Sequence, residues 1–357
     1  MIFPTWWTEF RIHSRRWLNW EFWPFYVFYA PIYFYWLYLS VRARSLSFFT
    51  AANPLMEAGG FIDYSKAAVL QHIPEKYLPI TGYLPESVLT VSTVLEWMNE
   101  KQLAFPIIIK PDKGERGFGV EKIDGISELD DYIAHYQRID ELFIVQEYCN
   151  EPLEFGIMYS RMSHESFGHI TSVVKKELIE LRGDGEKSLE ELILQNRRAS
   201  YYFPYFRQLL GAKMAQIPKE GEVVPLVQVG NHCRGATFLN ANHIIDKRLK
   251  EVFDAVSQQI PGYYFGRYDL KVRSIDDLYA GNFRIIELNG ANSEPAHIYD
   301  PQMTLRRAYR DLFAHWRRLF EVSVANHQRG IAYLPFNVLY RKIRHHLQIQ
   351  KNVVNLQ

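Results

Sequence analysis

The stretch 265-FGRYDLK-271, followed at a short interval by 285-IIELN-289, reads as two neighbouring strands. Side chains alternate across a strand, so Arg267 and Asp269 share one face of the first strand, and Glu287 and Asn289 share one face of the second. If these faces coincide, two carboxylates and an amide oxygen converge, and such ligands suit Mg²⁺. Arg267 would then stand ready to hold a transferring phosphoryl group. The alternative for this block alone is an amphipathic hairpin with a solvated charged face.

The composition is that of a globular chain. Its 357 residues predict two or three domains. A net charge of +1 argues against a dedicated nucleic-acid binder, so no nucleic-acid partner is expected. Cys149 and Cys233 have no CxxC spacing, which favours a reducing compartment over a disulfide framework or a zinc site.

Aromatic residues gather near the N-terminus. The run from Phe22 to Val41 holds 20 uncharged residues, of which 11 are Phe, Trp or Tyr. Pro24 and Pro31 interrupt it, which suits the headgroup boundary of a membrane better than the hydrocarbon centre. Arginines flank the run on both sides and favour anionic lipid, at positions 11, 15, 16, 42 and 44. We expect residues 1–52 to form a membrane-associating segment that lies in the interface, with a lid packed on the core or a true span as the alternatives.

A glycine-rich loop lies between two expected strands. Phe105 to Pro111 reads as a short buried strand, and Val120 to Ile123 as the next, with Gly114, Gly117 and Gly119 between them. This hairpin context excludes the dinucleotide-binding fingerprint, whose glycines open a helix. The bare amides of such a loop can approach a phosphate, beside the point charge of Lys110. The alternative is a mobile surface turn.

A polar link connects two further strands. Leu142 to Tyr148 and Phe155 to Tyr159 read as strands on either side of it. Backbone groups near Glu147 to Cys149 could pair with an adenine edge, and Glu154 could accept ribose hydroxyls. The alternative is an exposed acidic turn. Next along the chain come a strand with Lys175 and Lys176, a 183-GDG-185 turn and a capping box at 188-SLEE-191; the two lysines and the loop 231–237 receive no role.

In this order the elements resemble the ATP-grasp superfamily. The order as a whole is similar to D-alanine–D-alanine ligases, and the segment from Val174 to Ser188 is similar to cyanophycin synthetases. The resemblance covers roughly Ile62 to Pro301 and includes 63-DYSK-66, which looks like the helix start that supplies the family's first phosphate lysine. It implies an α/β (α+β) fold of two lobes, residues 53–150 and 151–301, with ATP between them and C-terminal amphipathic helices in 302–357.

The resemblance also implies roles for individual residues. The triphosphate would be held by Lys66 and Lys110 and covered by the loop with Gly114, Gly117 and Gly119, while adenosine would lie against Gln146, Glu147, Cys149 and Glu154. Arg267 and Lys110 would be catalytic. Asp269, Glu287 and Asn289 would carry two Mg²⁺ ions, or Mn²⁺ in their place. The implied reaction phosphorylates a carboxylate to an acyl phosphate, which an amine then attacks.

Two departures from the family leave the substrates open. Only about sixty residues precede the lobes where relatives carry a whole domain, and 290-GANSEP-295 is not the usual peptide-ligase tail. The aromatic run favours a membrane-borne carboxylate or amine, handled at the cytoplasmic face of the inner membrane by a peripheral or monotopic protein. The alternatives are a cytoplasmic ligase for soluble amino acids or peptides, with the aromatic segment as a buried lid, and a non-catalytic ATP-binding adaptor at the membrane.

The C-terminal part predicts two helices. Residues 304–328 place apolar side chains on one stripe, which favours packing against the core. Phe336, Leu339, Ile343 and Leu347 then recur opposite basic residues, a pattern that could lie on an anionic bilayer. A partner-binding or solvated tail is the alternative.

Overall fold

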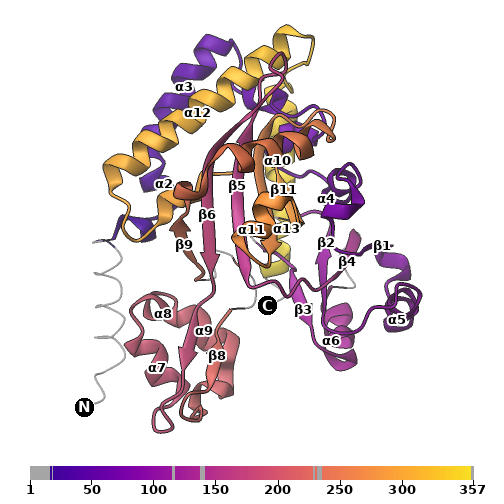
Figure 1. Ribbon diagram of the computed structural model, residues 1–357, viewed down its shortest axis with the longest axis vertical. Helices are drawn as coiled ribbons and strands as arrows, with labels where there is room; N and C mark the ends of the chain where they lie inside the picture. The colour runs from indigo at the N-terminus through magenta and orange to yellow at the C-terminus, as the bar shows by residue number, and fades with distance from the viewer. Residues whose placement is uncertain are drawn as a thin grey trace.

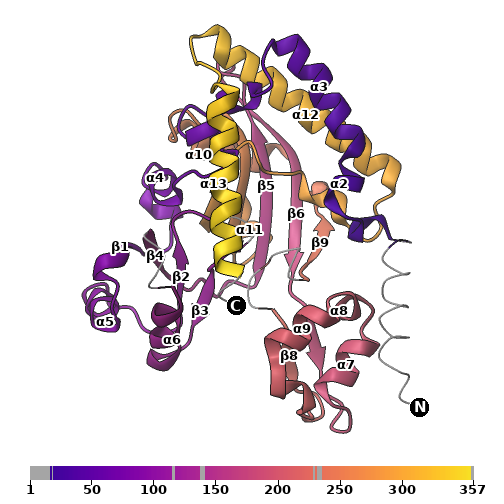
Figure 2. The same ribbon diagram turned by 180° about the vertical axis from the view of Figure 1, so that it is seen from behind.

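In the described residues, strand pairing forms two larger antiparallel sheets that lie side by side (Figures 1 and 2) and a third of two strands, β7 (Glu180–Arg182) and β8 (Val223–Pro225). The computed structural model describes residues 17, 19–114, 117–136, 141–227, 230 and 235–354, and for 349–354 the backbone alone. Arg11, Arg15, Arg16 and Cys233 therefore lie outside the described residues. The predicted mixed α/β class, preceded by a helical aromatic-rich segment, is confirmed.

The first sheet has four strands in the order β1-β4-β2-β3, namely β1 (Thr81–Pro85), β4 (Leu142–Glu147), β2 (Ile107–Pro111) and β3 (Glu121–Ile123). α5 (Val91–Glu100) and α6 (Ile126–Tyr136) pack on it through amphipathic faces. The alternating residues Ile107 and Ile109 of β2 are fully buried in this core. β2 pairs with β3, so the glycine-rich loop is a hairpin connection, as predicted.

The second sheet has five strands in the order β11-β10-β5-β6-β9, namely β11 (Phe283–Asn289), β10 (Phe265–Val272), β5 (Leu153–Ser160), β6 (His169–Glu177) and β9 (Thr237–Asn240). α10 (Lys247–Gln258) and α11 (Ile275–Ala280) share its core. So does α4 (Lys66–Leu70), although it precedes the first sheet in the chain. The domain limits at 53, 151 and 302 stay a prediction.

A small unit within the second lobe has a hydrophobic cluster of its own. It contains β7 (Glu180–Arg182), β8 (Val223–Pro225), α7 (Leu189–Gln195), α8 (Arg197–Tyr201) and α9 (Phe203–Leu210). The predicted capping box is present: Ser188 and Glu191 exchange side chain-to-backbone hydrogen bonds at the start of α7. This unit lies below the second sheet in the view of Figure 1.

The aromatic run folds into α2 (Phe25–Phe28) and α3 (Ala30–Ala43), and α3 runs alongside α12 (Leu305–Gln328) in both views (Figures 1 and 2). α12 matches the helix predicted over 304–328 and starts at a Thr304 cap. In the part of the chain that the structure describes, no helix has the length and apolarity needed to cross a membrane.

One side of the C-terminal helix α13 (Phe336–Val354) packs against the rest of the protein. Leu339 is buried and Ile343 packs on the same cluster, while Phe336 and Leu347 are exposed. Lys342 forms ion pairs with Glu57 and Asp63. The short 3-10 helices are η1 (Trp20–Phe22), η2 (Phe48–Ala51), η3 (Glu57–Gly60), η4 (Glu75–Tyr77), η5 (Glu86–Val88), η6 (Gly211–Ala215), η8 (Asn242–Ile244) and η9 (Ala296–Tyr299).

Candidate functional site

The polar side chains of β10 and β11 meet on one face of the second sheet. The strands pair antiparallel with Arg267 opposite Asn289 and Asp269 opposite Glu287, so the two faces coincide. Arg267 donates to both carboxylate oxygens of Asp269, from Nε at 2.8 Å and Nη2 at 3.0 Å. Asn289 Nδ2 donates to Asp269 Oδ2 at 3.2 Å, and the Tyr64 hydroxyl donates to Asn289 Oδ1 at 3.2 Å. A buried charged cluster therefore lies at the edge of the second lobe.

Lys176 joins this cluster from β6. Its Nζ lies 2.9 Å from Glu154 and 3.4 Å from Asp269, and its side chain is almost fully buried. Burial alone would lower the pKa of Lys176, but the carboxylates of Asp269 and Glu154 outweigh it and the pKa is raised. Burial likewise opposes ionisation of Asp269, yet Arg267 and Lys176 hold the pKa of its carboxyl below the ordinary value. Lys176 and Asp269 are thus held in their charged forms.

Sequence reasoning left Lys176 without a role. The signal was present in the period of two along β6, since Lys176 and its neighbour Lys175 must point to opposite faces. Lys175 pairs with Glu177 at the surface, whereas Lys176 lies opposite Glu154 in the register of β5 and β6. Only the pairing of β5 with both β6 and β10 shows that Lys176 reaches Asp269.

Two glycines make room for these side chains. A Cβ on Gly156 of β5 would lie 2.8 Å from Val174 Cγ1 and 3.1 Å from both Arg267 Cδ and Asp269 Oδ1. A Cβ on Gly266 would lie 1.9 Å from the Asn289 carbonyl oxygen. Glycine inside a strand marks a close approach of this kind.

The first lobe contributes two lysines to the boundary with the second. Lys110, at the end of β2, donates from Nζ to the Ile286 carbonyl of β11 at 3.1 Å. Lys66 follows the Ser65 cap of α4 and donates to the carbonyls of Asp112 and Gly114. Both lysines line a narrow crevice with Glu287. Burial lowers the pKa of Lys110 to about 8, against the opposing effect of the Glu287 carboxylate.

The glycine-rich loop begins beside this crevice. Gly114 supplies the carbonyl that Lys66 contacts, and Gly117 and Gly119 have positive φ angles of 78° and 63°. A Cβ on Gly119 would lie 2.7 Å from Pro111 Cδ, so the close packing against Pro111 also favours glycine at this position. The role of the loop as a phosphate cover stays a prediction.

The four residues predicted to seat adenosine have side-chain contacts in two neighbourhoods, and their assignment to adenosine stays a prediction. Gln146 Nε2 donates to Thr81 Oγ1 at 3.0 Å, and Glu147 Oε2 accepts from the Ile80 amide at 3.2 Å, so both side chains engage the segment at β1. Burial raises the pKa of the Cys149 thiol to about 12, so it stays protonated at neutral pH. Glu154 belongs instead to the Lys176 cluster.

The predicted metal ligands suit a hard divalent cation that takes further ligands from phosphates and water. Asp269 and Glu287 face each other across two strands and Asn289 adds an amide, which are oxygen donors appropriate to Mg²⁺. Across the described residues, no three or more His, Cys, Asp and Glu side chains gather into a self-sufficient cage. The assignment of Asp269, Glu287 and Asn289 as ligands stays a prediction.

Glu294 is a residue that sequence reasoning missed. Its Oε1 is buried without a hydrogen-bond partner among the described residues, while Oε2 accepts from the Tyr299 hydroxyl at 3.0 Å. Burial raises the pKa of Glu294 to about 7, although the Tyr299 hydrogen bond acts in the other direction. The Glu294 carbonyl lies 3.5 Å from Arg267 Nη1, so the residue borders the charged cluster. Its position in 290-GANSEP-295 carries no pattern that predicts burial.

A Ser-His-Asp chain also lies nearby and is structural. Ser172 Oγ and His297 Nδ1 are 2.7 Å apart, and His297 Nε2 lies 3.2 Å from Asp311 Oδ2. Ser172 is buried in β6, so its hydroxyl cannot reach a substrate. The chain of contacts links β6, η9 and α12.

No family model and no curated protein matches this sequence. Among solved structures, D-alanine–D-alanine ligase from Bacillus anthracis matches with 12% identity and a TM-score of 0.41, over 74% of this chain and 69% of that one. VanG D-Ala:D-Ser ligase from Enterococcus faecalis matches with 14% identity and a TM-score of 0.40, over 71% of this chain and 61% of that one.

A bifunctional glutathione synthetase from Pasteurella multocida matches with 14% identity and a TM-score of 0.34, over 70% of this chain. The chain spans only 36% of that synthetase. The solved structures that this chain resembles are ATP-grasp enzymes.

Proposed function

We propose that this protein is an ATP-dependent ligase that activates a carboxylate as an acyl phosphate and joins it to a nucleophile, normally an amine. One observation carries the proposal: a buried cluster of Arg267, Asp269 and Lys176 in one lobe lies close to the Lys110 ammonium group of the other, with Glu287 near both. Fixed positive charge and oxygen ligands at a lobe boundary are the requirements of phosphoryl transfer.

The basic and acidic residues would have different roles in phosphoryl transfer. Lys66 and Lys110 supply positive charge for the triphosphate, and Arg267 for the transferred phosphoryl group and the reacting carboxylate. Lys176 and Arg267 keep Asp269 ionised, so that it is ready to act as a ligand. When bound through Asp269, Glu287 and Asn289, Mg²⁺ would neutralise charge on the phosphates. The glycine-rich loop would exclude water from the acyl phosphate.

We propose further that one substrate is membrane-borne and is handled at the cytoplasmic face of the inner membrane. The support is the aromatic segment, whose helix α3 leaves large apolar side chains exposed on the same molecule. The competing possibilities are a ligase for soluble amino acids or peptides and an adaptor that binds ATP without turnover.

Mg-dependent ADP release in the presence of hydroxylamine tests the proposal, because hydroxylamine traps an acyl phosphate as a hydroxamate. The purified protein receives the aqueous and lipid fractions of a cell extract separately. We expect hydroxamate with the lipid fraction; hydroxamate with the aqueous fraction alone would favour soluble substrates. ATP binding without ADP release in either fraction would identify the adaptor.

A pair of variants sharpens the assay. Glu287→Gln removes a charge from the proposed metal set and should lower ADP release at least about a hundredfold. Glu177→Gln is the matched control, since Glu177 lies in the same sheet and pairs with Lys175 at the surface. Equal turnover by the two variants would refute the assignment of Glu287.

A further inference from the structure

The outward side of α3 is apolar where a surface helix is usually polar. Its exposed apolar side chains, with Tyr26 of α2, form one stripe that we call the α3 face: Tyr26, Tyr33, Phe34, Leu37, Tyr38 and Val41. Phe34 is 74% exposed and Val41 is 78% exposed. The positions recur every three or four residues, as one side of a helix requires. A continuous exposed stripe of this kind marks an interaction surface.

The inward side of the same helix is already occupied. Ile32 and Leu39 are buried, and the Tyr35 and Phe313 rings of α3 and α12 lie 5.0 Å apart. α3 therefore lies along α12 (Figure 1), and the exposed side chains of its other side are apolar. With 14 residues it measures about 21 Å, short of the roughly 30 Å hydrocarbon core of a bilayer. Such a helix can enter the headgroup region but cannot cross the membrane.

Exposed arginines lie at the end of α3 and along α12, the helix that packs against it. Arg42 and Arg44 are exposed at the end of the helix, and α12 exposes Arg306, Arg307, Arg310 and Arg317. The Tyr35 hydroxyl raises the pKa of Arg317, which places that guanidinium beside α3. The two acidic residues of α12 are engaged: Asp311 with Arg310 and His297, and Glu321 with Arg318. Arg310 is thus paired with Asp311, and the surplus positive charge of α12 lies on Arg306, Arg307 and Arg317.

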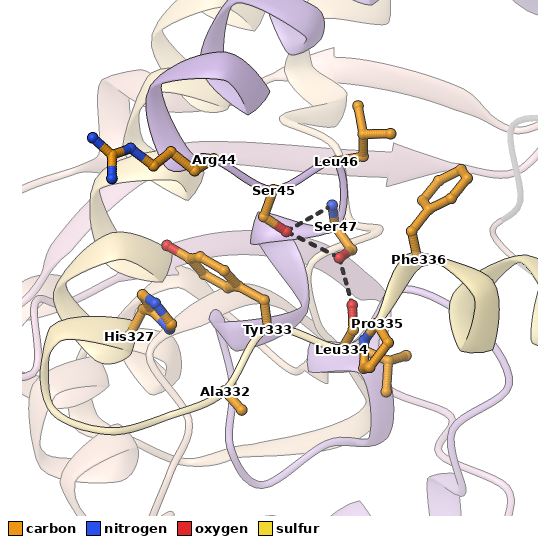
Figure 3. Close-up of a pocket in the computed structure, with 10 residues that line it drawn as sticks. All are labelled: Arg44, Ser45, Leu46, Ser47, His327, Ala332, Tyr333, Leu334, Pro335 and Phe336. Atoms are coloured by element: carbon orange, nitrogen blue, oxygen red, sulfur yellow. Dashed lines mark hydrogen bonds between the residues drawn. The ribbon is translucent and has the colours of Figure 1, made fainter.

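A shallow pocket of about 520 Å³ lies at the C-terminal end of α3. It lies between the turn that follows α3 and the link from α12 to α13 (Figure 3). Leu46 and Phe336 are exposed at its rim, with Arg44 on the opposite side (Figure 3). Ser47 is fixed by donating to the Leu334 carbonyl. The apolar stripe and the positive charge therefore continue together beyond the helix.

We propose that the α3 face is a docking surface for an anionic lipid bilayer, in which the aromatic stripe enters the headgroup region and the bordering arginines contact lipid phosphates. Aromatic side chains favour this depth of a membrane, and each arginine near an anionic surface adds to the attraction. Charge complementarity selects the anionic bilayer over a second copy of the chain, because two copies would bring their arginines together. The inference stands without ligase activity.

Vesicle co-sedimentation of the full chain tests this surface. The probes are vesicles of phosphatidylglycerol with phosphatidylcholine, and of phosphatidylcholine alone. We expect binding to the first kind that weakens with salt. Phe34→Ser, Leu37→Ser and Val41→Ser combined should lower the partition coefficient at least about tenfold. Arg306→Gln, Arg307→Gln and Arg317→Gln should lower it roughly fivefold each.

Matched controls come from exposed residues elsewhere. Phe167→Ser and Arg182→Gln replace an exposed aromatic residue and an exposed arginine outside the surface, and both should bind like the wild type. Unchanged melting temperatures confirm that the variants are folded. Undiminished binding by the triple serine variant, or equal binding to both kinds of vesicle, would overturn the proposal. So would lipid-free dimerisation, measured by ultracentrifugation, that the same serine substitutions abolish.

Discussion

At the site, buried side chains are stable in their charged forms because specific partners of opposite charge lie beside them. Lys176 is held in a largely dry environment because Glu154 and Asp269 lie at 2.9 and 3.4 Å. Its neighbour Lys175 is solvated and pairs with Glu177 at the surface. Adjacent lysines of one strand therefore differ in what their removal costs, since desolvated charges need their partners and exposed pairs contribute little.

Lys176→Met is expected to lower the free energy of unfolding by about 3 kcal/mol, because Glu154 loses its ion pair and Asp269 loses one of two cations. Lys175→Met provides the matched comparison and should change stability by less than about 0.5 kcal/mol. Urea unfolding monitored by circular dichroism measures both. Equal effects of the two substitutions would show that the charged cluster is solvated.

Glu294 should make stability depend on pH. Its pKa of about 7 lies above the ordinary value of 4.5, so the folded state holds a proton that the unfolded chain releases between these values. Stability contributed by the neutral carboxyl is therefore complete below pH 4.5 and is lost as the pH rises to about 7.

Glu294→Gln keeps the shape without the charge, so its advantage over the wild type should grow from pH 5 to pH 8, by up to roughly 3 kcal/mol. Tyr299→Phe removes the hydroxyl that donates to Glu294 and should move the transition to higher pH. Urea titrations at the two pH values supply the readout. A pH-independent difference for Glu294→Gln would contradict the burial of this carboxyl.

At the scale of elements, the spacing of strands decides whether the site can form. β5 lies between β6 and β10, and at Gly156 it presents no side chain to the Arg267–Asp269 pair. The pair occupies the space that a side chain would fill. The identity of residue 156 in β5 is thus determined by the functional residues of β10 as well as by the packing of β5 itself.

Gly156→Ala should displace the Arg267–Asp269 pair and lower both stability, by about 1–3 kcal/mol, and ADP release. Gly125→Ala is the control, because a Cβ there meets nothing within 4 Å. Thermal melts and the ADP assay on the two variants distinguish the effects. Wild-type melting temperature and ADP release in Gly156→Ala would mean that β5 and β10 can move apart at this position with no loss of stability.

At the scale of the whole molecule, the N-terminal segment ties distant parts together. Glu21 forms an ion pair at 2.7 Å with Arg198 of the small unit, and Arg198 also donates to the carbonyls of Gly235 and Ala236. Asn53 is fully buried and bonds the backbone of β10 at Phe265, while Asn326 of α12 donates to the carbonyls of residues 51 and 52. From residue 19 onward the segment is therefore part of the folded body, and the α3 face is the side that we propose for lipid contact.

Local pattern accounts for most elements. The strands predicted over 142–148 and 265–271 are present as β4 and β10, and the apolar stripe of 304–328 predicts α12. Ser188 and Glu191 predict the start of α7, and the glycines after β2 predict a hairpin connection. These features rest on neighbours within a few residues, which the sequence lists in order.

The sequence by itself thus determined strands such as β4 and β10, the helix α12 and the two faces that carry Arg267, Asp269, Glu287 and Asn289. Tertiary structure alone decided which residues join them: Lys176 reaches Asp269 only across β5, and Glu294 accepts a hydrogen bond from Tyr299 of η9. It also decided which side of α3 is left exposed, because α12 covers the other one. Local propensity depends on near neighbours, whereas burial and charge pairing depend on segments brought together from far along the chain.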